Sequence, residues 1–279
     1  MHKTWFITGA SRGFGRLWAE AALERGDHVA ATARDVAALE PLAARFGEAL
    51  VPVRLDVTDR EAVFDAVAYA AERLGRLDVV VNNAGYGHFG MVEELTESEL
   101  RAQLETNFFG TVWVTQAVLP VLRAQRSGRI LQVTSEGGVR AYPGIGAYHA
   151  SKWAVEGLSE SLAQEVAVFG IGVTNVEPGP YATEFAGSLS LRASQQHPDY
   201  DDVRVSTAPR FEIGDPEATR SAILAIADAE HPPLHVFLGK PLADVEEIYA
   251  ERLRTWREWQ PVALAAFGDP GRGDAESAA

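Results

Sequence analysis

Short apolar runs alternate with longer amphipathic segments along most of the chain. Runs of four to six residues rich in Val, Ile, Leu or Phe are typical of strands buried on both faces. The predicted strands are Trp5–Thr8, Val29–Thr32, Leu50–Leu55, Leu77–Val81, Arg129–Val133, Gly172–Val176 and His235–Leu238. The segments with helical spacing are Gly15–Arg25, Asp35–Phe46, Asp59–Leu74, Glu97–Arg126, Tyr148–Phe169, Pro216–Ala229 and Leu242–Glu258.

This alternation predicts an α/β fold, with a doubly wound, mostly parallel sheet of about seven strands and helices on both faces. Residues 183–214 lack a clear period and predict a long loop or mobile lid over the substrate. Residues 268–279 are small and polar, which predicts a disordered tail. We therefore expect one domain over residues 1–260 and a C-terminal extension over 261–279 with a disordered end.

The composition excludes several classes of function. Hydrophobic residues make up 47% of the chain, enough for a sizeable core. The net charge of -14 disfavours nucleic acid and anionic membranes as partners. No apolar run approaches the ~20 residues of a membrane span, and the N-terminal residues lack a signal-peptide pattern. Without cysteine there are no disulfides or thiolate metal sites, and no metal site is predicted; we expect a cytoplasmic protein.

A glycine-rich turn, T-G-A-S-R-G-F-G at residues 8–15, joins the first predicted strand to the first predicted helix. Such a turn places backbone N–H groups and a helix N-terminus where they can bind a phosphate. Gly9, Gly13 and Gly15 follow the spacing G-x-x-x-G-x-G, which differs from the commoner dinucleotide pattern G-x-G-x-x-G. The turn alone therefore leaves two interpretations open, a phosphate site or a plain tight turn.

Two arginines indicate which dinucleotide would bind. Arg34 follows the second predicted strand, where an acidic residue would bind the ribose hydroxyls of NAD. A guanidinium at this place favours a 2′-phosphate, and Arg12 comes from the neighbouring strand end. Arg34 alone could equally be a solvated charge at a helix start, but the two arginines together favour NADP(H) over NAD(H). Asp35 is predicted to cap the next helix.

Tyr148 and Lys152 are four residues apart, which places them on one face of a predicted helix. Only 3 of the 25 basic residues are lysines, so a lysine here indicates that a compact ammonium is needed. Carbonyl reduction by a nicotinamide requires a proton donor, and a nearby ammonium lowers the pKa of a tyrosine hydroxyl. Ser135 ends the fifth predicted strand, where it can hold the substrate oxygen.

Several motifs together resemble the short-chain dehydrogenase/reductase family in its single-domain, NADP-preferring form. They are T-G-A-S-R-G-F-G, N-N-A-G at 82–85, Asn107 in E-T-N-F-F-G, Ser135, Y-H-A-S-K from Tyr148 and P-G-P-Y-A-T at 178–183. The resemblance implies a Rossmann-like fold with Tyr148 as acid/base. It implies that Lys152 lowers the pKa of Tyr148 and holds the nicotinamide ribose, and that Ser135 orients the substrate oxygen. Asn107 would support a water-linked proton relay to Lys152.

The resemblance also implies cofactor contacts along the whole strand edge. Asp56 is expected near the adenine amine, and Pro178, Gly179 and Thr183 near the nicotinamide. The full expected set is Gly9, Ser11, Arg12, Gly13, Phe14, Gly15, Arg34, Asp56, Val57, Asn83, Ala84, Gly85, Tyr148, Lys152, Pro178, Gly179 and Thr183.

Substrate choice is expected to come from Tyr86–Phe89, Glu136–Ile145, Tyr181 and the 185–212 loop. Within these segments the individual candidates are Glu136, Tyr142 and Tyr181. Glu136 either contacts a polar substrate or is an exposed loop charge, and the second interpretation is favoured. His149 is interpreted as a helix-face residue and not as a second acid/base. The apolar residues of the loop favour a moderately hydrophobic ketone, aldehyde or secondary alcohol; they are Phe185, Leu189, Leu191, Tyr200, Val203 and Phe211.

The resulting hypothesis is an NADPH-dependent carbonyl reductase or secondary-alcohol dehydrogenase acting on a small molecule. One alternative is a non-enzymatic NADP-binding sensor on the same fold. Others are an NAD-dependent alcohol dehydrogenase working in the oxidative direction, and an enzyme of this fold that dehydrates or epimerises its substrate. The resemblance further implies a homodimer or homotetramer formed through the helices Glu97–Arg126 and Tyr148–Phe169.

Overall fold

The computed structural model describes residues 2–187, 190–206 and 212–268, which fall into two compact units divided after Lys240. In the second unit one helix is described, α9 (Leu242–Phe267), which continues past the predicted end at Glu258. None of the helices in these ranges is long and apolar enough to cross a membrane. The tail beyond residue 268 lies outside the described residues, and the domain limit at residue 260 stays a prediction.

The main sheet has seven strands, all parallel, which confirms the predicted fold class. The strands are β1 (Thr4–Ile7), β2 (His28–Ala33), β3 (Leu50–Arg54), β4 (Val79–Asn82), β6 (Gly128–Val133), β7 (Ile171–Pro178) and β9 (His235–Leu238). Their order is β3-β2-β1-β4-β6-β7-β9, so the direction of winding reverses between β1 and β4. Ligands of such sheets bind beyond the carboxyl ends of the strands at this reversal.

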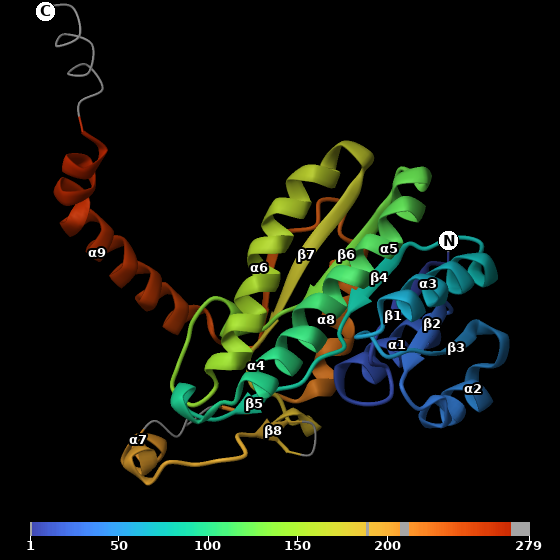
Figure 1. Cartoon of the computed structure of the whole chain (residues 1–279). Helices are drawn as coiled ribbons and strands as arrows, with labels where there is room; N and C mark the ends of the chain where they lie inside the picture. The colour runs from blue at the N-terminus through green and yellow to red at the C-terminus, as the bar shows by residue number, and fades with distance from the viewer. Residues whose placement is uncertain (1, 188–189, 207–211, 269–279) are drawn as a thin grey trace, which may run out of the picture. The chain divides into compact units, whose positions relative to one another are not determined.

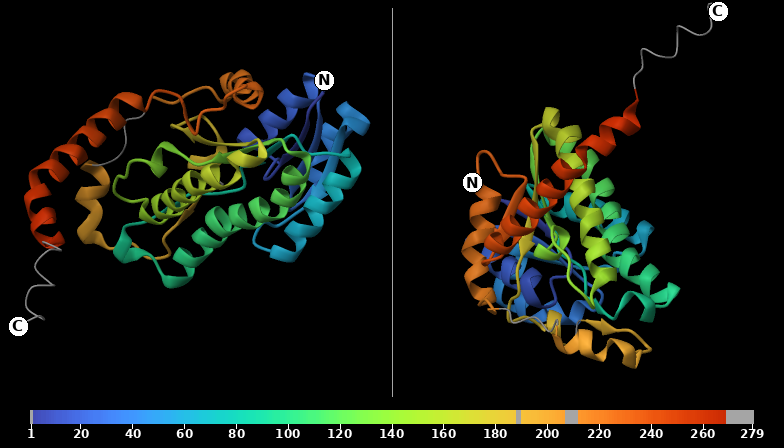
Figure 2. Two further views of the ribbon diagram at one scale, coloured as in Figure 1. Left: turned by 90° about the horizontal axis from the view of Figure 1, so that it is seen from above. Right: turned by 90° about the vertical axis from the view of Figure 1, so that its left-hand side faces the viewer.

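Helices cover both faces of the sheet, and each face has its own apolar core (Figures 1 and 2). One face carries α1 (Gly13–Glu24), α2 (Glu40–Phe46) and α8 (Thr219–Asp228), and the other carries α3 (Arg60–Leu74), α5 (Gly110–Gln125) and α6 (Gly146–Val166). Trp18 and Ile223 are fully buried in the first core, and Val118 and Leu162 are buried in the second. The indole N–H of Trp18 donates to Thr219 Oγ1 at 2.9 Å, which fastens α1 to α8.

The helix predicted over Glu97–Arg126 is interrupted. α4 (Glu97–Leu104) and α5 are joined by a π-helical turn at Glu105–Phe109. Such a turn adds one residue to a helical turn and redirects the side chains after it, and it is frequent at functional sites. Asn107 lies in this turn and is fully buried.

The 183–214 segment contains more regular structure than its sequence predicted. β8 (Leu191–Arg192) pairs in parallel with β5 (His88–Phe89) in a separate small sheet, and α7 spans Asp201–Ser206. Two carboxylates fix the segment further: Glu94 Oε1 accepts from the N–H of His197 at 2.6 Å, and Glu99 Oε1 accepts from the N–H of Ser194 at 2.9 Å. Residues 188–189 and 207–211, with the predicted lid residues Leu189 and Phe211, lie outside the described residues.

Candidate active site

The glycine turn after β1 allows the backbone to approach a ligand closely. Gly9 and Gly13 have φ of +65° and +55°, where side chains are rarely tolerated. A Cβ at Gly15 would lie 2.5 Å from both Asn83 Nδ2 and Gly9 O, so only glycine fits there. Arg12 precedes α1 without capping it through its side chain. The first N–H groups of α1 are therefore free of a side-chain cap and available to an anion.

Thr8 and Asn83 fasten this turn to the end of β4. Thr8 Oγ1 accepts from the N–H groups of Asn83 at 2.9 Å and Ala84 at 3.0 Å. In return, Asn83 Nδ2 donates to the carbonyl oxygens of Thr8 at 2.9 Å and Gly9 at 3.1 Å. The N-N-A-G segment thus lies beside the glycine turn, at the point where the winding of the sheet reverses.

A cleft of about 700 Å³ runs along the carboxyl ends of the strands. It is lined by the whole expected catalytic and cofactor set except Gly15 and Asn107, and by the three individual substrate candidates. Arg12 and Arg34 both line it with exposed side chains, and neither side chain has a partner within the described part of the chain. The predicted cap is also confirmed, because Asp35 accepts from the N–H of Ala37 at 3.1 Å.

Ser135, Tyr148 and Lys152 come together in the cleft. Ser135 follows β6, and its hydroxyl donates to the carbonyl oxygen of Pro178 at 3.4 Å and accepts from the N–H of Gly137 at 3.0 Å. Tyr148 and Lys152 lie one turn apart on α6, with Lys152 Nζ 5.7 Å from the centre of the Tyr148 ring. Nζ donates to the carbonyl oxygen of Val133 at 2.8 Å, which holds the ammonium at the end of β6.

Burial dominates the electrostatics of this pair. Burial raises the pKa of Tyr148 well above its ordinary value, although the hydrogen bond with Ser135 acts in the opposite direction. Burial also lowers the pKa of Lys152 to about 8, opposed by the charge of Glu156. Loss of water disfavours phenolate and ammonium alike, and the predicted lowering of the Tyr148 pKa by Lys152 stays a prediction. Tyr148 remains protonated at neutral pH.

Asn107 does not line the cleft, and both the nitrogen and the oxygen of its side-chain amide form hydrogen bonds. Its Nδ2 donates to the carbonyl oxygen of Tyr86 at 2.9 Å and to Ser151 Oγ at 3.0 Å, and its Oδ1 accepts from the N–H of Tyr86 at 3.1 Å. A Cβ at Gly85 would lie 3.1 Å from Asn107 Oδ1 and 3.5 Å from Lys152 Nζ. Asn107 thus lies close to Lys152 while it ties the segment after β4 to α6. Its part in a proton relay stays a prediction.

Glu136 is not the exposed loop charge that was favoured. It is 3% exposed, and its Oε2 lies 3.0 Å from Arg140 Nη2. The expectation was wrong because Arg140, four residues on, offsets the cost of burying a carboxylate in this turn. Glu136 lines the cleft beside Ser135, so the contact with a polar substrate stays open.

His149 has a structural role, in agreement with its interpretation as a residue that is not a second acid/base. Its Nε2 accepts from the N–H of Tyr142 at 3.2 Å, so Nδ1 carries the hydrogen and donates to the carbonyl oxygen of Gly137 at 2.8 Å. Burial lowers the pKa of His149, which keeps the ring neutral. The neutral ring holds the Gly137–Tyr142 segment against α6.

Comparison with known proteins identifies the family. The family described as short chain dehydrogenase matches residues 3–193. The chain belongs to the short-chain dehydrogenase/reductase family. It is therefore an NAD(P)-dependent oxidoreductase acting on CH–OH groups, which argues against a non-enzymatic sensor.

Two curated relatives and one crystal structure show how far the similarity extends. The enzyme is 43% identical over 278 residues to Oxidoreductase BOA17 of Botryotinia fuckeliana, covering 95% of this chain and 100% of the relative. It is 38% identical over 248 residues to 3-ketodihydrosphingosine reductase of Bacteroides thetaiotaomicron, covering 86% of this chain and 88% of the relative. The crystal structure of a short-chain dehydrogenase from Streptomyces avermitilis superposes on this structure with a TM-score of 0.88 at 39% identity, covering 95% of this chain and 98% of the other.

Solved relatives of this dehydrogenase have been captured with both types of nicotinamide cofactor. An alcohol dehydrogenase from the archaeon Thermococcus sibiricus is complexed with 5-hydroxy-NADP (29% identity, TM-score 0.70, coverage 85% and 96%). A 3-ketoacyl-(acyl-carrier-protein) reductase from Brucella melitensis is complexed with NADH (26% identity, TM-score 0.73, coverage 85% and 96%). Family membership therefore leaves the choice between the two cofactors to the residues of this cleft.

Aromatic and aliphatic side chains line the substrate end of the cleft. The ring of Phe185 lies 5.2 Å from that of Tyr148, and Tyr181 packs edge-on against Phe14 at 5.3 Å. Tyr200 and Val203 do not line the cleft, contrary to expectation; the hydroxyl of Tyr200 instead donates to Glu93 Oε2 at 2.6 Å. The lining also includes residues that the sequence did not single out, among them Thr106, Pro180 and Ile213.

Proposed function

We propose that this enzyme is an NADPH-dependent carbonyl reductase that also catalyses the reverse oxidation of a secondary alcohol. The observation that carries the proposal is the meeting of Ser135, Tyr148 and Lys152 with the glycine turn in a single cleft. The turn fits a dinucleotide, because Gly15 leaves no room for a side chain and the N-terminus of α1 has no side-chain cap. A bound nicotinamide cofactor would supply the hydride.

The chain's own residues supply the proton and hold the substrate. Tyr148 carries its hydroxyl proton at neutral pH, so it can act as the acid that protonates the carbonyl oxygen. The adjacent Ser135 hydroxyl hydrogen-bonds the same oxygen and orients it. The Lys152 ammonium, held by the carbonyl oxygen of Val133, stabilises the phenolate left after proton transfer.

The expected substrate is a moderately hydrophobic ketone or secondary alcohol. Phe89, Phe185, Leu191 and Ile213 provide apolar contacts, while the Glu136–Ile145 segment brings Glu136 to the polar end. The relative named as 3-ketodihydrosphingosine reductase supports a ketone as the reacting group. A turnover screen with NADPH over ketones of increasing length tests the proposal. NADPH binding without oxidation on any ketone would contradict it, whereas faster turnover with NADH would favour the NAD-dependent alternative.

Arg34→Ala is expected to weaken NADPH binding by tenfold or more and to change NADH binding little. A charge-assisted hydrogen bond to phosphate contributes about 1.5–3 kcal/mol, and only NADPH carries the 2′-phosphate. Fluorescence titration of both cofactors measures the two dissociation constants. Arg45→Ala is the matched control, because Arg45 is an exposed arginine outside the cleft that pairs with Glu24. An equal loss of both affinities in Arg34→Ala would remove the proposed 2′-phosphate contact.

A homodimer or homotetramer in the cytoplasm is the proposed setting. The expectation that α5 and α6 form the subunit contact rests on family resemblance. Val155 and Leu162 of α6 are buried within the subunit, so exposed positions of these helices would have to form any such contact.

A further inference from the structure

A buried ammonium needs a counter-charge, and the buried carboxyl group one helical turn after Lys152 on α6 is placed to supply it. Lys152 is buried, and its Nζ has the carbonyl oxygen of Val133 as its hydrogen-bond partner. A carbonyl dipole alone offsets little of the cost of burying a full charge. The carboxylate that favours the charged form is that of Glu156, one helical turn after Lys152 on α6.

Glu156 is packed into its position behind Lys152. A Cβ at Gly138 would lie 3.0 Å from Glu156 Cγ and 3.1 Å from its Oε1, so the turn after Ser135 needs a glycine to admit this side chain. Asn175 of β7 donates its Nδ2 hydrogen bond to Glu156 Oε2. Burial, with the neighbouring charge of Glu177, raises the pKa of Glu156 to about 7. Its charge therefore depends on the groups around it.

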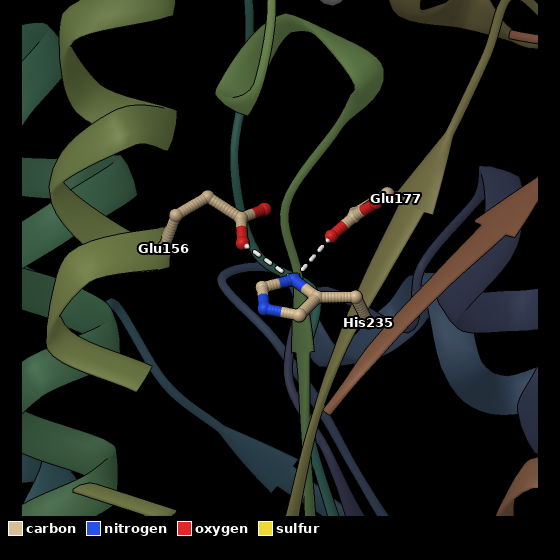
Figure 3. Close-up of side chains that lie close together, drawn as sticks. All are labelled: Glu156, Glu177 and His235. Atoms are coloured by element: carbon tan, nitrogen blue, oxygen red, sulfur yellow. Dashed lines mark hydrogen bonds and ion pairs between the residues drawn. The ribbon is translucent and has the colours of Figure 1, made fainter. Parts of the chain in front are cut away.

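Two residues connect Glu156 to solvent (Figure 3). His235 Nδ1 on β9 lies 2.7 Å from Glu177 Oε1 and 3.5 Å from Glu156 Oε2. The His235 side chain is 42% exposed, whereas Glu177 is 1% exposed and burial raises its pKa to about 7. The other ring nitrogen, Nε2, lies 3.8 Å from Glu160 on the surface of α6. The charged and titratable groups around Glu156 are thus Glu177 of β7, His235 of β9 and, one turn away on α6, Lys152; Glu160 reaches His235 on its other side.

The geometry fits a shared proton better than a metal ion. Glu156, Glu177 and His235 are close enough to be considered as metal ligands. The 2.7 Å contact between His235 and Glu177 is of hydrogen-bond length, shorter than the roughly 3.3 Å between two ligands of a tetrahedral zinc. Asn175 also directs an N–H group at the Glu156 oxygen that a cation would need.

We propose that Glu156 is a positioning residue that holds Lys152 in its charged form, and that Glu177 and His235 control the charge of Glu156 by exchanging a proton with solvent. Above a pH of about 7 Glu156 is ionised and stabilises the ammonium. Without Glu156, Lys152 would lose its proton at a lower pH than the value of about 8 that it has with Glu156. The effect on turnover rests on the proposed function, whereas the effect on the charge of Lys152 does not.

Lysine NMR tests the charge directly. The chain has three lysines, Lys3, Lys152 and Lys240, so carbon-13 labelling at Cε yields three signals in the full-length protein. Loss of one signal in Lys152→Met assigns Lys152. In Glu156→Gln its titration midpoint should fall by about one pH unit, the usual effect of losing a neighbouring opposite charge. Glu165→Gln, an exposed change on the same helix, should leave the midpoint unchanged.

Further variants separate charge from structure. Glu156→Asp keeps the charge and should restore most of the shift, and His235→Asn should give a smaller fall because His235 favours the ionised form of Glu156. If Glu156→Gln does not fold, the Lys152 titration midpoint measured in His235→Asn tests the proposal in its place. A Lys152 midpoint unchanged in folded Glu156→Gln overturns the proposal, as does stoichiometric zinc in the purified protein.

The turnover readout separates this proposal from the proposed function. The basic limb of the pH profile of kcat/KM should shift together with the NMR midpoint. If the NMR midpoint shifts but the enzyme turns over no substrate, the proposed function is wrong and the role of Glu156 stands.

Discussion

Tyr148→Phe is expected to lower kcat by about a thousandfold while leaving the Kd for NADPH within about threefold, because a positioned general acid contributes about 10²–10⁴-fold to the rate. The substitution removes the hydroxyl that shares the cleft with Ser135, from a residue one turn before Lys152. It keeps the ring that packs against Phe185 at 5.2 Å, so the cleft should retain its shape. Stopped-flow measurement of NADPH oxidation and fluorescence titration of cofactor binding give the two quantities.

Tyr142→Phe is the matched control for Tyr148→Phe. Tyr142 lines the same cleft and is half-buried, and burial raises the pKa of its hydroxyl to about 12. His149 holds the backbone N–H of Tyr142, so the loop should stay in place without the hydroxyl. We expect kcat to change by less than about tenfold, which is no more than the loss of one ordinary hydrogen bond would cause. Comparable losses in both variants would mean that Tyr148 has no special part in proton transfer.

The sheet could be predicted because buried parallel strands form continuous apolar runs, a pattern that adjacent residues carry by themselves. All seven predicted runs correspond to strands of the main sheet. β5 and β8 could not be predicted in this way. Each has two residues, too few for a period, and β5 pairs with a segment about a hundred residues further along the chain. Their pairing depends on tertiary packing.

The residues of the cleft could be predicted because parallel strands all end at one edge of the sheet. The π-helical turn around Asn107 could not, since one additional residue in a helical turn leaves the apolar spacing almost unchanged. The burial of Glu136 was also missed, because it depends on the pairing with Arg140 and on the fold of the turn between them. Glu156 was overlooked although a signal existed: it continues the spacing of four from Tyr148 and Lys152 on the same helix face.

The Tyr148 pKa shows where reasoning from residue types is incomplete. A tyrosine beside a lysine predicts a lowered pKa when both remain in contact with water. In this fold both are buried, and the loss of solvent raises the pKa of Tyr148 and lowers that of Lys152. The size of a desolvation effect depends on how many atoms surround the titrating group. For Tyr148 and Lys152 that number is fixed only when α6 packs on the sheet.

Gly15→Ala is expected to lower the free energy of unfolding by about 1–3 kcal/mol, the usual cost of overpacking, and to weaken NADPH binding more than tenfold. The added methyl group would lie 2.5 Å from Asn83 Nδ2 and from Gly9 O. Asn83 would have to give up its hydrogen bonds to the carbonyl oxygens of Thr8 and Gly9, and the Gly9 carbonyl belongs to the backbone of the turn itself. The turn and the segment after β4 would therefore separate on the side that faces the cofactor.

Gly157→Ala is the control for that change, because the two glycines both lie in helices and differ in what surrounds them. Apart from its chain neighbours and the backbone of its own helix, no heavy atom lies within 4 Å of a Cβ at Gly157, an exposed position in α6. There the methyl group should raise stability by about 0.5–1 kcal/mol through helix propensity alone. Urea denaturation and cofactor titration of both variants measure the difference. If Gly15→Ala retains wild-type affinity for NADPH, the close contact between the turn and Asn83 does not shape the cofactor site, and the phosphate-binding role of the turn loses its structural basis.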